Sequence, residues 1–503
     1  MASQTLASHV ANHADSQDKL YKQVALRISE LIEHGTLRPG DRLPSVRQLS
    51  EQESVSLSTV TQAYRRLEDQ GLIEARPQSG YYVRARIWSA PPEPGLSHPG
   101  RSATRVSVNE LVMEVLRHTH DPSLLAFGAA SPGPELLPTD QLMRTMASVG
   151  RRHSREWNGC SIPPGNLYLR TQIARRALES GCLLAPEEIV ITCGCQEAVN
   201  LCLRAVAKPG DTIAIESPTY YGILQIIESL GMKVCEIPTF PREGVCLDEL
   251  ASRLDRCRIK ACVFVPNFSN PLGSCMPDEK KERLVNLLAE RQIPLIEDDL
   301  YGTLSHAPRR PKTAKAFDKQ GLVLLCDSFS KTLAPGMRIG WTAPGRFKDK
   351  VEHLKFIASI GTATLPQMAI AEFLASGGYD HHLRKLRRIY AEQMQLATQA
   401  ITRYFPEGTK VTRPTGSYVL WVELPPFIDS LDLFHRALAE KISLAPGHIF
   451  SPTQNYQNCI RLSCGHLWSE AMEKGLWRLG KIMGQMERES RGRARVESRP
   501  AAS

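Results

Sequence analysis

Between residues 189 and 326, short runs rich in β-branched residues alternate with longer stretches of helical periodicity. The runs are IVIT (189–192), TIAI (212–215), ACVFV (261–265), PLI (294–296) and LVLLC (322–326). Helical patterns such as 197–207 and 278–290 lie between them. This alternation is typical of βαβ units and predicts a doubly wound α/β domain. Ligands of such domains bind outside the carboxyl ends of the strands.

Residues suited to chemistry follow each predicted strand. In chain order they are Gly194, Cys195, Gln196, Tyr220, Asn270, Asp298, Tyr301, Ser328, Ser330, Lys331 and Arg338. A lysine amine can form a Schiff base, and a carboxylate can hold a ring nitrogen protonated. Arginine, serines and a helix N-terminus can bind a phosphate. Lys331 alone could be a surface lysine and Asp298 a strand-end cap, but the ordered set predicts a site for pyridoxal 5'-phosphate.

The motifs NPLG, EDDLYG and SFSKTLAPGMRIGW resemble the fold-type I aminotransferases over almost the whole of this region. The resemblance implies that Lys331 is the catalytic Schiff-base lysine and that Asp298 is the partner of the pyridine nitrogen. Asn270 and Tyr301 would contact the ring hydroxyl, and Tyr220 would stack on the ring. The other residues of the set would hold the phosphate. The family also implies a smaller C-terminal α+β subdomain.

Arg461, within NCIRLSCG, resembles the arginine that binds the α-carboxylate of an amino acid in this family; otherwise it is an ordinary strand arginine. The sequence departs from the family at three positions. Cys195 stands in place of Ser or Ala, and Leu272 in place of a frequent Thr. Cys160 stands where relatives often present a Tyr to the neighbouring subunit's phosphate, a change that could lower cofactor affinity or catalytic competence.

The N-terminal part of the chain has the pattern of three helices and a hairpin. Apolar residues at helical spacing from Leu20 predict a first helix that ends near Gly35, and Ser45 with Gln48 predicts a capping box at the start of a second. A third helix, starting at Ser56 or Ser58, would bury Val60, Ala63, Tyr64 and Leu67 and turn outward Thr59, Thr61, Gln62, Arg65 and Arg66. The segment LIEARPQSGYYV predicts two short strands around a tight turn.

This order of elements predicts a winged helix-turn-helix whose third helix enters the major groove of double-stranded DNA; the alternative is a protein-interaction module. The run from PGDRLPSVRQLSEQ to ARPQSGYYV resembles the GntR family of bacterial transcription regulators. The resemblance and the placement of arginines together predict a set of DNA contacts. They are Arg42, Ser45, Arg47, Ser56, Ser58, Thr59, Thr61, Arg76 and Gly80. Leu57 departs from the family, because many relatives carry Arg there.

The predicted boundaries are a winged helix-turn-helix domain at 18–86, a Pro-bearing linker at 87–118, the aminotransferase-like domain at 119–485 and a flexible tail at 486–503. Hydrophobic residues make up 42% of the 503, which excludes a mostly disordered chain. No apolar run could span a membrane and no secretory signal is evident, so we expect a cytoplasmic protein. The 13 cysteines have no zinc-site spacing, so we expect no metal.

Together the two halves resemble the MocR subgroup of the GntR family. The resemblance implies a homodimer that binds an operator and senses pyridoxal 5'-phosphate, an amino-acid or amine effector, or both. A working aminotransferase of α-amino acids with a DNA-binding head is the alternative, because every group needed for transamination is present; whether the chain acts as an enzyme is therefore left open. A third possibility is a DNA-binding dimer with a vestigial cofactor pocket.

Overall fold

The computed structural model describes residues 20–29, 31–32, 36–37, 40–69, 72–76, 79–84, 90–118, 121 and 123–497. The chain divides into two compact units, Met1–Ser89 and Ala90–Ser503. Each unit has its own hydrophobic core. No helix in the described residues is both long enough and apolar enough to cross a bilayer.

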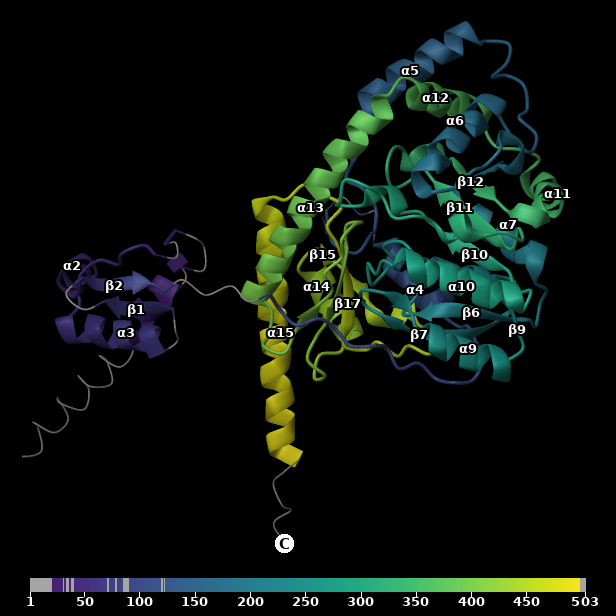
Figure 1. The fold of residues 1–503 in the computed structure, drawn as a ribbon. Coiled ribbons are helices and arrows are strands. Elements are labelled where there is room, and N and C mark those ends of the chain that lie inside the picture. The colour runs from purple at the N-terminus through teal and green to yellow at the C-terminus, as the bar shows by residue number, and fades with distance from the viewer. Residues whose placement is uncertain are drawn as a thin grey trace, which may run out of the picture. The chain divides into compact units, whose positions relative to one another are not determined.

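The N-terminal unit contains a first helix over residues 20–29 and 31–32, then α2 (Val46–Gln52), α3 (Leu57–Asp69) and the antiparallel pair β1 (Ile73–Arg76) and β2 (Gly80–Val83) (Figure 1). The predicted capping box is confirmed. Gln48 N donates to Ser45 Oγ at 3.2 Å, and Ser45 N donates to Gln48 Oε1 at 3.0 Å. The expected helix end at Gly35 and the tip of the hairpin, residues 77–78, lie outside the described residues.

The predicted buried face of α3 is confirmed, since Val60, Ala63, Tyr64 and Leu67 are fully buried. The expectation for Thr59 is wrong: its side chain is only 2% exposed, so it cannot reach DNA. Thr59 lies one turn before Ala63 and beside Val60, which turns it toward the core. Its hydroxyl is within 2.8 Å of Ser56 Oγ, so the helix start satisfies this buried polar group.

The larger unit is built on a nine-stranded sheet with the order β3-β7-β6-β9-β10-β11-β12-β5, to which β8 is added at β7. The central strands β7, β6, β9, β10 and β11 are parallel. Their bounds, with those of the flanking strands, are β3 (Thr104–Arg105), β5 (Val190–Thr192), β6 (Thr212–Ser217), β7 (Lys233–Phe240), β8 (Gly244–Val245), β9 (Ile259–Phe264), β10 (Leu295–Asp298), β11 (Val323–Ser328) and β12 (Gly340–Ala343). All five predicted strands are confirmed, whereas β3, β7, β8 and β12 were not predicted.

Helices and a smaller sheet complete this unit (Figure 1). The helices are α4 (Asn109–Arg117), α5 (Thr139–Arg152), α6 (Leu167–Ala177), α7 (Gly194–Val206), α8 (Tyr221–Ser229), α9 (Leu247–Arg256), α10 (Asp278–Glu290), α11 (Lys348–Ser359), α12 (Thr364–Ala375), α13 (Gly378–Tyr404), α14 (Ser430–Ala439) and α15 (Glu470–Glu497). The second sheet, in order, is β13 (Lys410–Val411), β14 (Val419–Glu423), β17 (Cys459–Ser463) and β16 (Ala445–Pro446). A short parallel pair joins β4 (Leu125–Ala126) to β15 (Ile442–Ser443). The predicted α/β fold with a smaller C-terminal α+β subdomain is confirmed.

Two segments differ from their predicted character. Within the expected linker 87–118, β3 pairs with β7, and α4 buries Val112 and Val115 in the main core. The preceding arm, residues 90–103, has no helix, but hydrogen bonds join it to the larger unit. Within the expected tail 486–503, α15 continues to Glu497, and an ion pair of Arg436 with Glu489 at 2.9 Å joins this part of the helix to α14.

Candidate functional site

The predicted cofactor residues gather at one edge of the large sheet. Asp298 is the last residue of β10 and lies in register with Cys326 of β11. Ser328 ends β11 and lies opposite Gly340 of β12. Because parallel neighbours end at the same edge, residues far apart in the sequence meet there.

Asp298 is held by two donors on the same oxygen. Its Oδ1 accepts from Leu300 N at 3.1 Å and from the Cys195 thiol at 3.4 Å. Burial raises the pKa of Asp298 to about 6, and these hydrogen bonds counteract part of that rise. The second oxygen, Oδ2, has no hydrogen-bond partner among the described residues and is available to a ligand's N–H group.

Lys331 lies three residues beyond β11 and is partly buried. Its Nζ donates to Ala130 O at 2.5 Å. Burial, followed by the positive charge of Arg461, lowers the pKa of Lys331 to about 8. A larger share of neutral amine results near neutral pH, which is what attack on an aldehyde requires.

The start of α7 offers backbone N–H groups to an anion. Gly194 has φ of +77°, and a Cβ at this position would lie 2.5 Å from Nη2 of Arg338. Glycine is therefore required for the guanidinium to come close to the helix N-terminus. The N-cap, Cys193, makes no side-chain capping hydrogen bond. The first turn, with Cys195 and Gln196, and the Arg338 cation together suit a phosphate group.

Three buried polar atoms near Lys331 and Asp298 lack a hydrogen-bond partner within the described residues. They are Tyr301 Oη, Ser330 Oγ and Arg461 Nε. Buried polar groups are nearly always hydrogen-bonded in native proteins, so such a group of exceptions indicates a missing ligand. All three residues were predicted from the sequence to bind cofactor or substrate. The donor set thus fits a planar, phosphorylated aldehyde such as pyridoxal 5'-phosphate.

Arg461 comes from the second sheet, where it is fully buried on β17 opposite Trp421. One guanidinium nitrogen lies 3.4 Å from Asn270 Oδ1, and the other donates to Gly128 O. The contact between Arg461 and Asn270 brings together residues 191 positions apart. An arginine fixed in this way with Nε unused can bind a carboxylate.

Tyr220 follows β6 and packs against Tyr221, with ring centroids 4.6 Å apart. A Cβ on Gly222 would lie 2.4 Å from the Tyr220 ring, so the missing side chain makes room for this ring position. Of the residues that depart from the family pattern, Leu272 is buried and Cys160 is exposed.

Two features of the site were not predicted. The Cys195 side chain contacts Asp298, whereas the sequence suggested a role for Cys195 only toward the phosphate. Glu216, next to the end of β6, is 2% exposed, and burial raises its pKa to about 8. Its position just before SPTYYG was visible in the sequence, but its burial was not.

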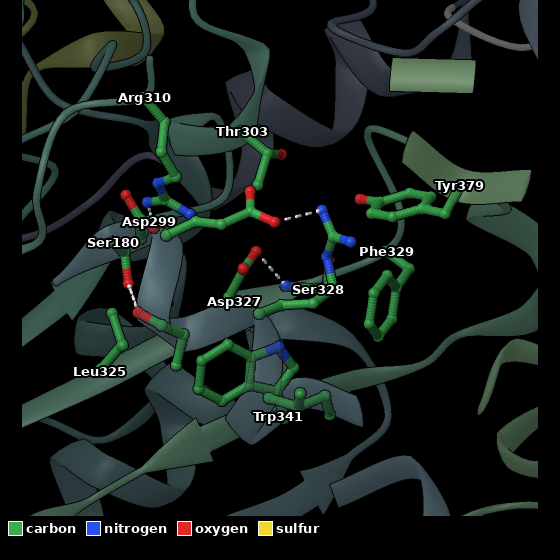
Figure 2. A pocket seen from close by; sticks show the side chains of 14 residues that line it. Ser180, Asp299, Thr303, Arg310, Leu325, Asp327, Ser328, Phe329, Trp341 and Tyr379 are labelled. Carbon is green, nitrogen blue, oxygen red and sulfur yellow. Dashed lines mark hydrogen bonds and ion pairs between the residues drawn. The ribbon is translucent and has the colours of Figure 1, made fainter. Parts of the chain in front are cut away.

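A separate small pocket lies beside Ser328 (Figure 2). Its volume is about 30 Å³, which exceeds the roughly 10–15 Å³ that one buried water molecule needs. Arg310 pairs with Asp299 at its wall, and Asp327 accepts from Ser328 N at 2.6 Å. Neither Lys331 nor Asp298 lines it, so it is not the candidate cofactor site.

The predicted DNA contacts differ in their accessibility. Exposed or partly exposed side chains and one exposed glycine are found at Arg42, Ser45, Arg47, Ser56, Ser58, Thr61, Arg76 and Gly80. Arg76 lies over the Tyr82 ring at 4.4 Å and pairs with Glu74 at 2.8 Å. These contacts hold it on the hairpin. Apart from buried Thr59, the predicted set lies on the surface of the unit.

A model of class I and II aminotransferases matches residues 131–479, and a model of bacterial regulatory proteins of the gntR family matches residues 20–83. YjiR of Escherichia coli, an uncharacterized HTH-type transcriptional regulator, is 40% identical over 92% of this chain and 98% of its own. The 2-aminoadipate transaminase of Thermus thermophilus is 31% identical over 76% of this chain and 96% of its own. A crystal structure of Thermus thermophilus LysN, an alpha-aminoadipate aminotransferase complexed with N-(5'-phosphopyridoxyl)-L-leucine, is 29% identical with a TM-score of 0.69, covering 75% of this chain and 94% of that chain.

Proposed function

The chain belongs to the MocR-type regulators of the GntR family, and on that premise we propose that it is a pyridoxal phosphate-dependent, DNA-binding transcription regulator. The observation that carries the proposal is a group of buried atoms around Lys331 and Asp298, on Tyr301, Ser330 and Arg461, that have no hydrogen-bond partner in the described part of the chain. A GntR-type head on the same chain gives such a site a DNA-binding output.

The residues of the site have distinct roles toward the cofactor. When bound, pyridoxal phosphate supplies an aldehyde that reacts reversibly with amines. Lys331 would offer its amine, and Oδ2 of Asp298 would accept a hydrogen bond from the protonated ring nitrogen and so keep that nitrogen charged. Tyr301 and Asn270 would donate to the ring hydroxyl, and Tyr220 would cover the ring. The start of α7, with Ser328, Ser330 and Arg338, holds the phosphate.

The effector is an amino acid or a related amine carrying a carboxylate. Arg461 is oriented by Asn270 and by Gly128 O, and its unused Nε points to a carboxylate as the missing partner. An amine held there can compete with Lys331 for the cofactor aldehyde. A change in the bonding of the Lys331 amine would alter its contacts, including its hydrogen bond to Ala130 O.

The arm at residues 90–103 would transmit this change toward the head. Thr239 N donates to Ser97 Oγ at 2.8 Å, and Ser217 N donates to Thr239 Oγ1 at 3.2 Å. Ser217 also lies 2.7 Å from the Tyr456 hydroxyl and only three residues before Tyr220. Hydrogen bonds thus run from the arm to Ser217, which precedes Tyr220 by three residues. Coupling of about 1–3 kcal/mol is enough for a regulatory switch.

A homodimer would present two heads to two DNA half-sites. Large apolar side chains are exposed at Ile162, Phe356, Ile357 and Ile360. Their segments adjoin, since Thr364 Oγ1 donates to Gly159 O at 2.8 Å. Exposed apolar groups on adjoining segments mark a contact surface for another protein, and we assign it to a second copy of the chain.

The test is to measure binding of the purified protein to its own promoter region with and without pyridoxal phosphate, then with single amino acids. We expect the affinity to change with cofactor or effector, and the Lys331→Ala variant to lose that change while still binding DNA. Equal affinity under all conditions would refute regulation through this site.

A working transaminase is the second candidate. It is favoured by the lowered pKa of Lys331 and by the buried Arg461 together. Incubation with amino donors and keto acids separates the two: sustained product formation supports the enzyme, and a spectral change without product supports the sensor.

A further inference from the structure

The tip of α3 presents one large apolar side chain to solvent. Leu57 is the first residue of the helix, and it is 52% exposed. It is not among the residues that pack on the core of the N-terminal unit, although Val46 and Val55 are. Leu57 therefore contributes little to the stability of its own domain.

The hydroxyl groups around Leu57 are already bonded to one another. Ser56 Oγ accepts from Thr59 N at 3.2 Å and lies 2.8 Å from both Ser58 Oγ and Thr59 Oγ1. Thr61 Oγ1 donates to Leu57 O at 2.8 Å. The hydroxyls cap and brace the helix, so the side chain that projects from its tip is apolar.

In helix-turn-helix proteins the N-terminal residues of the recognition helix contact base edges in the major groove. The only apolar group on a base edge there is the 5-methyl group of thymine. Arg47 on α2 and Arg65 on α3 are also exposed and can supply positive charge for the flanking phosphates. Given the proposed DNA-binding function, we propose that Leu57 recognises a thymine methyl group and thereby determines base preference at one position of each half-site.

The experiment begins with selection of binding sites from random DNA by the full-length, cofactor-loaded protein. In the selected site each thymine is then replaced singly by uracil, which removes only the methyl group. One uracil should weaken binding about fourfold per half-site, as expected for a methyl-sized apolar contact. Leu57→Ala should bind both DNAs equally, and Leu57→Arg should select guanine at that position.

The control is Leu26→Ala, which removes another exposed leucine, 61% accessible, from the first helix of the same unit. It should keep the sensitivity to uracil. The inference is overturned if no uracil weakens wild-type binding more than twofold, or if Leu57→Ala keeps the sensitivity. If no DNA is selected at all, the proposed DNA-binding function fails too. If DNA is selected but shows no sensitivity to uracil, only the inference about Leu57 fails, so the two failures are distinguishable.

Discussion

The buried carboxyl of Glu216 makes the stability of the cofactor-free protein depend on pH. Its side chain is 2% exposed; Oε2 accepts from Val265 N at 3.0 Å, and Oε1 has no hydrogen-bond partner among the described residues. Burial raises the pKa of this carboxyl from 4.5 to about 8, with a smaller contribution from Asp298. The perturbation we choose is Glu216→Gln, which keeps the shape and cannot ionise.

The sign follows from the raised pKa in the folded state. Below pH 4.5 the carboxyl is protonated in both the folded and the unfolded protein, so ionisation of Glu216 costs the folded state nothing. As the pH rises toward 8 the unfolded chain ionises while the folded protein stays protonated, so stability is lost. Each pKa unit corresponds to 1.36 kcal/mol, which gives a loss of about 4 kcal/mol between pH 5 and pH 8.

The assay is thermal unfolding of the cofactor-free protein at pH 5 and pH 8. The larger unit spans Ala90–Ser503, and at a typical unfolding entropy per residue 4 kcal/mol corresponds to about 5 °C in Tm. We expect the difference in Tm, Glu216→Gln minus wild type, to increase by that amount from pH 5 to pH 8, because only wild type loses stability over this range. The exposed Glu407→Gln variant is the control and should track wild type. A Tm difference between Glu216→Gln and wild type that does not change with pH would refute the reasoning.

Three further predictions address the two units. Lys331→Ala should lose the visible absorbance of the lysine-bound cofactor without a change in circular dichroism; retention of that absorbance would mean that another amine is used. Arg461→Lys should weaken the spectral response to amino acids about tenfold or more, because a lysine cannot make the bidentate contact, while the spectrum without effector is unchanged; an unaltered response would exclude Arg461 as the carboxylate ligand. Leu67→Ala removes a fully buried side chain at a cost of about 2–5 kcal/mol, which is most of the stability of a domain this small. DNA binding should therefore fall while cofactor absorbance persists, and loss of both would contradict independent folding of the units.

Local sequence patterns were sufficient for the strands and for the cap of α2. Short continuous apolar runs predicted β6, β9, β10 and β11, because a parallel strand is buried on both faces. The capping box at Ser45 depends on residues three apart and was equally readable. Thr59 was misjudged because a helix with a wide buried face also covers the residue at its margin.

Contacts between distant segments were decided only by the tertiary structure. The arm before α4 has no periodicity, because it is held by individual hydrogen bonds such as that of Ser97 with Thr239. The thiol of Cys195 on Asp298 and the hydrogen bond between Arg461 and Asn270 join residues 103 and 191 positions apart. Sequence determined which groups stand at each strand end, since periodicity is local. Their distances, burial and shifted pKa values arise only when the chain closes around them, because low dielectric and missing water are properties of the packed interior.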